Sequence, residues 1–253
     1  MTADRWMRAV RQQVGLGRIL PLGGAREGAW IAEQAVETVL RRAVARDAPG
    51  VRLDGVRIGL ADPEGATDEP VVPPPPSALP PGPLRLTVGF AATAARPVPV
   101  TAARLRAVLA EAVVERVGLA VTSVDLRVTE LLDAESVPVS APVVEPEPEP
   151  AAEAEAEAES APSADGGDSE ADRVAAAALA VAGVSRLTGT LGRSVHLTEQ
   201  PGAGALPRRH VRVDLAVEAD ACALDVARGV RSAVASALAG GRPTVAVLIT
   251  ATD

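Results

Sequence analysis

The sequence contains no lysine, no tyrosine, one cysteine and two histidines, and each scarcity excludes a class of chemistry. P-loops and Schiff-base enzymes both depend on a lysine amine, so neither is compatible with this chain. Cys222 has no second cysteine, which excludes an intramolecular disulfide and a cysteine-rich zinc site. His196 and His210 do not form an HExxH motif or another dense ligand set. We expect no enzymatic activity, no cofactor and no metal ion.

Long hydrophobic runs are also missing. The longest, 174–184, has 11 residues and is mostly alanine, whereas a membrane-spanning helix needs about 20. The first residues lack the apolar core of a secretory signal peptide. We expect a cytoplasmic protein, and this leaves peripheral membrane contact open.

The net charge of -8 comes from one segment of the chain. Residues 134–170 hold 11 of the 33 acidic residues, six prolines and no arginine, so the remainder carries a net charge of +3. Alternating Pro and Glu cannot bury enough apolar surface to offset the entropy of ordering, which predicts a disordered linker. A second breaker segment, 61–83, holds nine prolines and predicts a stiff exposed loop or a docking segment for an aromatic-lined groove.

Outside these two segments, the halves of the chain share one pattern. Alternating apolar residues predict half-buried strands at 84–90 and 211–217, and a helix and a closing strand follow each. The apolar positions of these later elements are related by a constant offset of 121 residues. They are Leu105, Leu109, Val113 and Val117 against Val226, Val230, Val234 and Leu238 in the helices, and Val124, Leu126 and Val128 against Val245, Val247 and Ile249 in the strands.

Each half is also expected to open with a helix and a short strand. The segment 29–46 predicts a helix with Trp30 and Ile31 on its apolar side, and 171–183 is its alanine-rich counterpart. Short strands are expected at 56–58 and 195–197.

These patterns predict an α+β fold of two repeated two-layer units joined by the disordered acidic linker. Each unit has the order helix–strand–strand–helix–strand, with a three-stranded sheet and the helices on one face. Because each unit is small and poor in aromatics, we expect the units to pack on each other or on another chain. The expected segments are 1–26, a basic amphipathic helix and a glycine-rich turn; 27–133, the first unit with its loop 61–83; 134–170, the linker; and 171–253, the second unit.

The apolar pattern resembles the alkaline-shock, or envelope stress response, family of bacterial cytoplasmic proteins. The resemblance is carried by the Gly-Val pairs at 50–51 and 183–184, the alternating strands, the helix segment 226–234 and the terminal strand 245–249, and it is best across 173–250. It implies an abundant, non-enzymatic, self-associating protein at the inner face of the cytoplasmic membrane, attached there through a partner protein and linked to envelope stress. It brings no catalytic residues.

The N-terminal segment is a candidate contact with a membrane or a partner. An amphipathic helix over 2–14 separates apolar from basic side chains, and residues 1–26 carry a net charge of +4. Anionic lipid, a protein surface or a frayed terminus are the three alternatives. The residues that this helix would present are Arg5, Trp6, Met7, Arg8, Val10, Arg11 and Val14.

A second candidate is the basic cluster Arg208, Arg209 and Arg212, which either contacts an anion or solvates the edge of a strand. The histidines beside it are interpreted as strand-end residues, since a metal site would need further ligands. A Ser194–His196–Asp214 triad lacks any elbow or oxyanion signature.

We therefore expect a non-enzymatic scaffold at the envelope. Its expected partners are other proteins, including a membrane-anchored protein or a second copy of the chain, and an anionic lipid surface. The alternative is a cytoplasmic regulatory adaptor that contacts nucleic acid or a transcription component through arginine clusters, although direct nucleic-acid binding is disfavoured by the lack of stacking aromatics.

Overall fold

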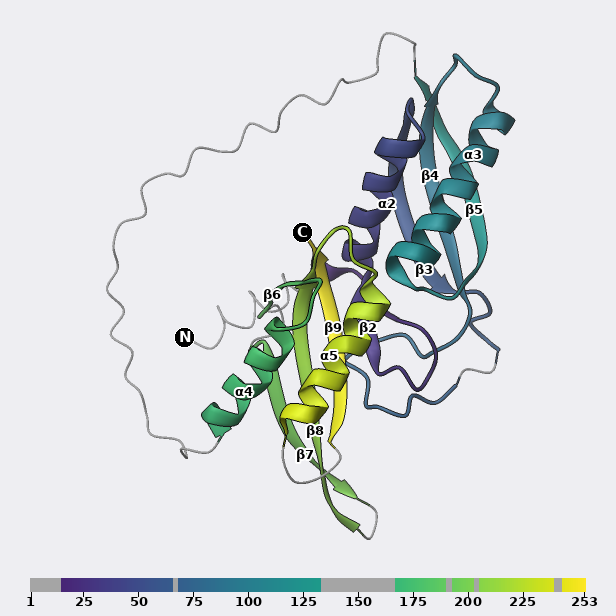
Figure 1. Ribbon diagram of the computed structural model, residues 1–253. Helices are drawn as coiled ribbons and strands as arrows, with labels where there is room; N and C mark the ends of the chain where they lie inside the picture. The colour runs from purple at the N-terminus through teal and green to yellow at the C-terminus, as the bar shows by residue number, and fades with distance from the viewer. Residues whose placement is uncertain (1–14, 66–67, 133–166, 190–192, 203–204, 239–242) are drawn as a thin grey trace, which may run out of the picture.

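A computed structural model describes residues 15–65, 68–132, 167–189, 193–202, 205–238 and 243–253. The expected linker and the N-terminal helix over 2–14 lie outside the described residues. The described part is a mixed α+β structure with two sheets (Figure 1).

The first sheet is formed by the first half of the chain and has three strands in the order β3-β4-β5. Strand β4 pairs antiparallel with β3 and parallel with β5. Leu84, Leu86, Val88 and Phe90 alternate toward the core, as predicted. The elements are α2 (Glu33–Asp47), β3 (Val51–Leu60), β4 (Leu84–Thr93), α3 (Val98–Glu111), the π-helix η1 (Ala112–Val117) and β5 (Val121–Leu132).

The second sheet contains all strands of the second half. Strand β8 pairs parallel with β9, while its other edge pairs antiparallel with β6 and then with β7. The predicted helical stripe Val226, Val230, Val234 and Leu238 is buried, as is its counterpart from Leu105 to Val117. The elements are α4 (Gly167–Leu179), β6 (Val184–Leu187), β7 (Val195–Gly202), β8 (Ala205–Val217), α5 (Ala223–Ala237) and β9 (Thr244–Thr252).

The expectation of three strands is wrong for this second sheet, which has six. Three strands are additional: β6 of the second half, and the pair β1 (Ile19–Pro21) and β2 (Ala29–Ala32) from the N-terminal region. Strand β2 pairs parallel with β9. Trp30 and Ile31 therefore lie in a strand, not in the predicted helix. The expected glycine-rich turn likewise contains a strand. The whole of β2 is buried, and the N–H of Val247 donates to the carbonyl oxygen of Gly28 at 3.0 Å.

Helix α2 begins only at Glu33, a buried carboxylate that ties three elements together. Its Oε1 accepts the backbone N–H of Ile58 in β3 at 2.8 Å, and its Oε2 accepts the N–H of Arg18 beside β1 at 3.3 Å. Hydrogen bonds of this kind compensate the desolvation of a buried acid. The helix start is thus set by tertiary contacts that periodicity does not encode.

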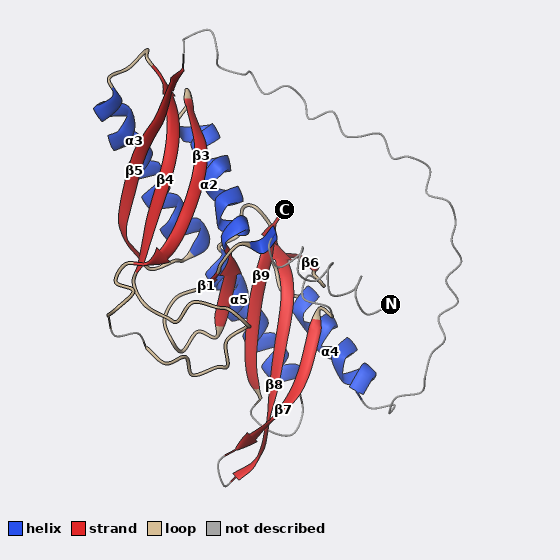
Figure 2. Cartoon of the chain, turned by 180° about the vertical axis from the view of Figure 1, so that it is seen from behind, coloured by secondary structure: helices blue, strands red, loops and turns tan. Residues whose placement is uncertain are grey.

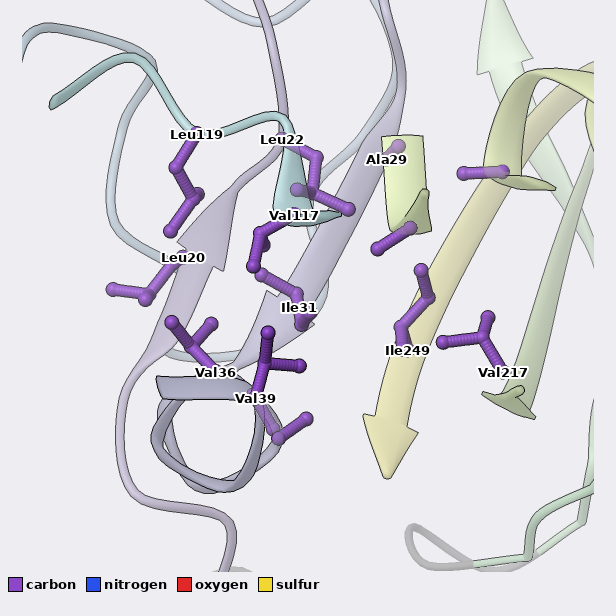
Figure 3. Close-up of a cluster of buried hydrophobic side chains, with 14 of the residues drawn as sticks. Leu20, Leu22, Ala29, Ile31, Val36, Val39, Val117, Leu119, Val217 and Ile249 are labelled. Carbon is purple, nitrogen blue, oxygen red and sulfur yellow. The ribbon is translucent and has the colours of Figure 1, made fainter. Parts of the chain in front are cut away.

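The two halves share one continuous apolar core. Helix α2 contacts both β3 and β9, and therefore both sheets. Figure 3 shows part of this core, in which Ile31 and Val36 of the first half belong to the same cluster as Ile249 and Val217 of the second. The two halves also approach closely at Gly118, which follows η1. A Cβ at this position would lie 2.5 Å from the side chain of Leu224 at the start of α5, so only glycine allows this contact. Within the described residues the two halves of the chain therefore pack on each other, which is one of the two expected arrangements.

The proline-rich segment packs on the second sheet. The N–H of Leu79 donates to the carbonyl oxygen of Ile19 at 2.9 Å, and Val72 joins a separate apolar cluster with Trp30 and Leu248. This cluster lies on the face of the sheet that the helices do not cover. Figure 2 shows the chain from that side, with the strands in front of the helices. The prediction of a stiff exposed loop is wrong for Val72, which is 3% exposed, because the segment covers an apolar strip of sheet.

Gly28→Ala tests the strand pairing between the halves. Gly28 has φ +57°, and a Cβ there would lie 2.8 Å from the Val72 side chain and 3.0 Å from the carbonyl oxygen of Val245. We expect a loss of about 1–3 kcal/mol in the free energy of unfolding, measured by urea denaturation. Gly24→Ala is the control, since no atom lies within 4 Å of its Cβ position. Equal stability of the two variants would contradict the close packing at Gly28.

Val72→Asp tests the seating of the proline-rich segment. Burying a carboxylate at this position should destabilise the protein by at least about 2 kcal/mol. The neighbouring Val71→Asp serves as the matched control, because Val71 is 65% exposed and should change stability by less than about 0.5 kcal/mol. If thermal denaturation does not separate the two variants, the segment does not pack on the sheet in solution.

Candidate functional site

The helix-free face of the second sheet carries a polar group beside the apolar strip around Trp30. His196 on β7, Arg212 and Asp214 on β8 and Thr250 on β9 contribute to it. His196 lies opposite Arg212 across the ladder, and Asp214 lies opposite Leu248. The strands thus place a carboxylate, a guanidinium and an imidazole on one face of neighbouring strands.

Asp214 is the most unusual of these groups, since its side chain is 0% exposed. Its Oδ1 accepts from Arg212 Nε at 3.0 Å, while Oδ2 is buried and has no hydrogen-bond partner. Its backbone is held by the segment that joins β6 to β7, through Thr188 and Ser194. Burial raises the pKa of Asp214 to about 6, and the opposing effect of Arg212 is smaller.

The pKa values of both histidines are lowered, which favours the neutral imidazole. Burial lowers the pKa of His196, and the nearby charge of Arg212 lowers it further. The same two causes lower the pKa of His210, whose Nδ1 lies 2.9 Å from Thr244 Oγ1. The Nε2 atom of His196 is buried without a hydrogen-bond partner. The group therefore contains two unpartnered polar atoms, on Asp214 and on His196.

His196 and Asp214 do not form the hydrogen-bonded relay of a Ser-His-Asp triad. In a Ser-His-Asp triad the imidazole bonds to both the carboxylate and the hydroxyl. Here His196 Nε2 and Asp214 Oδ2 are both unpartnered, and the carboxylate binds Arg212 instead. Among the described residues, no group of three or more His, Cys, Asp and Glu side chains is placed to hold a metal ion.

Two of the three predicted anion-binding arginines have carboxylate partners within the chain. Arg209 Nη1 lies 2.6 Å from Glu170 of α4, and Arg212 is held by Asp214. The side chain of Arg208 and residues 5–14, with the predicted membrane-contacting side chains, lie outside what the structure describes. Anion binding by this cluster stays a prediction.

A small basic hollow lies where the two halves meet. Arg42, Arg46 and Arg116 line it together with Asp220. Its volume of about 80 Å³ is well below the roughly 300 Å³ of a small-molecule pocket. Each guanidinium also has a partner, since Arg42 donates to the carbonyl oxygen of Asp253, Arg46 pairs with Asp47, and Arg116 pairs with Asp220. This hollow is better explained as part of the junction than as a ligand site.

A different kind of surface lies on the first sheet, at strand β5. Within the described part of the chain β5 pairs only with β4, so its outer edge is open. Val128 is 41% exposed and Leu131 is 58% exposed, which is unusual for large apolar side chains on one strand. The sequence predicts the strand and its alternation, with Val128 as one of its apolar positions beside Val124 and Leu126. The local pattern does not reveal that Val128 lies on a strand with an open edge.

Comparison with family models, with curated proteins and with solved structures found no significant match. In the described residues, no helix combines the length and the apolar character that crossing a bilayer requires.

The raised pKa of Asp214 predicts a pH dependence of stability. The folded protein retains the Asp214 proton up to about pH 6, whereas the unfolded chain releases it near pH 4, so stability should fall as the pH rises between these values. Two pKa units correspond to up to about 3 kcal/mol. Asp214→Asn should remove this part of the slope and be more stable than the wild type at pH 7.

Urea denaturation from pH 4 to pH 8 measures this effect. Asp220→Asn is the control, because the Asp220 side chain is fully exposed. If Asp214→Asn and Asp220→Asn show the same pH profile, the buried carboxyl does not titrate in this range.

Proposed function

We propose that this protein is a non-enzymatic scaffold that acts at the cytoplasmic face of the membrane in the response to envelope stress. Its resemblance to the alkaline-shock family supports the location and the stress link. The observation that carries the scaffold proposal is the open edge of β5. A strand of twelve residues, unpaired along its outer edge and with exposed apolar side chains, offers backbone groups and apolar surface to another protein.

We also propose that the two halves are divergent copies of one unit. The ladders support this, since β3–β4 and β7–β8 are antiparallel while β4–β5 and β8–β9 are parallel. A helix with a buried four-residue stripe connects each parallel pair. Insertion of β2 beside β9 then distinguishes the second copy, while the corresponding edge at β5 stays open.

The N-terminal segment is proposed to assist membrane contact. Arg5, Arg8 and Arg11 would face anionic headgroups, with Trp6 at the level of the interface. Each arginine near an anionic surface contributes about 1 kcal/mol. Replacing all three by glutamine and Trp6 by serine should therefore weaken binding to vesicles containing phosphatidylglycerol by about 100-fold.

Native cell fractionation of the full-length chain tests the proposed function. We expect the wild type in the membrane fraction, and the quadruple variant is the comparison. Loss of the variant from that fraction assigns attachment to the helix, and its retention assigns attachment to a membrane protein bound by the folded part. If both proteins stay in the soluble fraction with and without envelope stress, the scaffold proposal is wrong and the adaptor alternative gains support.

A further inference from the structure

The open edge of β5 presents its backbone groups at every second residue. Arg106 Nε of α3 donates to the carbonyl oxygen of Val124 at 3.3 Å, so this carbonyl is within reach of a side chain and is directed away from β4. In a parallel ladder, residues alternate between pointing both backbone groups at the neighbouring strand and pointing both away. Leu126 and Val128 therefore also direct their N–H and C=O groups outward.

The side chains of this segment alternate between two environments. Val124 and Leu126 pack against the shared core from the helix-covered face. Asp125 and Arg127 stand on the opposite face, which no helix covers, and both are exposed. The ladder to β4 is regular from Ser123 to Val128, with irregularities only before and after.

We propose that β5 pairs antiparallel with β5 of a second copy of this chain, with Leu126 facing Leu126 across a two-fold axis. In this register Asp125 lies opposite Arg127 of the other copy, and the symmetry produces the contact twice. Val128, now exposed, lies beside Val124 of the other copy. The two three-stranded sheets join into one continuous sheet. This inference deepens the proposed scaffold function by naming a second copy as the partner of the open edge.

The charges select this register over its alternatives. A two-fold axis at Asp125 or Arg127 would place like charges opposite each other, which is unfavourable. An axis at Val124 or Val128 would leave both charges without an opposite partner across the strands. Only the axis at Leu126 combines outward-pointing backbone groups at the centre with two attractive charge pairs.

The interactions that the edge of β5 makes within one chain are weak and exposed to solvent. Asp125 lies 3.7 Å from Arg85, with more than half of both side chains exposed, and among the described residues Arg127 has no ion pair. The long Arg106 contact would be exchanged for a backbone hydrogen bond. Proteins keep edges unpaired with prolines, bulges or charged side chains. From 123 to 128 there is no proline and no bulge, and the two charges, Asp125 and Arg127, have opposite signs and can therefore pair with a second copy of the strand.

A charge-swap cycle in the full-length protein tests the proposal by sedimentation equilibrium. Asp125→Arg and Arg127→Asp should each weaken the dimer at least about tenfold, because each puts like charges opposite each other twice. The double variant D125R/R127D restores opposite charges and should return to within about threefold of the wild type. Arg57→Asp is the control, since Arg57 is exposed on the far edge strand of the same sheet.

Disulfide trapping checks the register independently. In the background of Cys222→Ser, Leu126→Cys should give a disulfide-linked dimer, because facing residues at the axis bring their Cα atoms to about 5.5 Å. Leu131→Cys should not, although Leu131 is more exposed, because it faces Val121 rather than itself.

A wild type that stays monomeric at all concentrations overturns the proposal, and so does a dimer that neither charge reversal weakens. A monomer that still fractionates with membranes would leave the scaffold function standing with another protein on the edge. A charge-sensitive dimer found only in the soluble fraction would uphold the interface and contradict the proposed function.

Discussion

The pairing of β2 with β9 is the constraint on which the rest of the structure depends. It places a strand from the beginning of the described chain beside the last strand, so the second sheet cannot be completed without the N-terminal half. Helix α2 follows β2 directly and is thereby held between the two sheets. Glu33 then connects the same helix to β1 and β3 through backbone hydrogen bonds. One strand addition thus turns two thin units into a single body with one core.

The same pairing explains why the two faces of the second sheet differ. The helix-covered face is the shared apolar core, whereas the other face is divided between the strip around Trp30 and the polar group around Asp214. The proline-rich segment covers the strip, which gives this low-complexity sequence a structural role. Asp214 is left buried with an unsatisfied oxygen, and such a group costs stability unless it is protonated.

Much of the core could be predicted from periodicity, and the reason is physical. The stripe from Leu105 to Val117 and its counterpart from Val226 to Leu238 repeat at the helical period, and both are buried. The sequence predicts a helix at Trp30 and Ile31, because a short, wholly apolar segment fits a helix or a strand, and only pairing with the distant β9 decides between them. The burial of Asp214 and Val72 could not be predicted either, since remote segments cover them. The open edge at β5 could not be predicted from the local sequence either, because an edge depends on which strands pair in the sheet and not on the strand itself.

Hydrogen exchange during denaturant unfolding tests most directly whether the two halves form one body. The amides of β4, in the first sheet, and of β9, in the second, are the relevant probes. The structure predicts that both groups lose protection in the same cooperative transition, because β2 and α2 connect the sheets. Two separate transitions, with the amides of β9 surviving after those of β4 have exchanged or the reverse, would contradict the account and describe two independent domains.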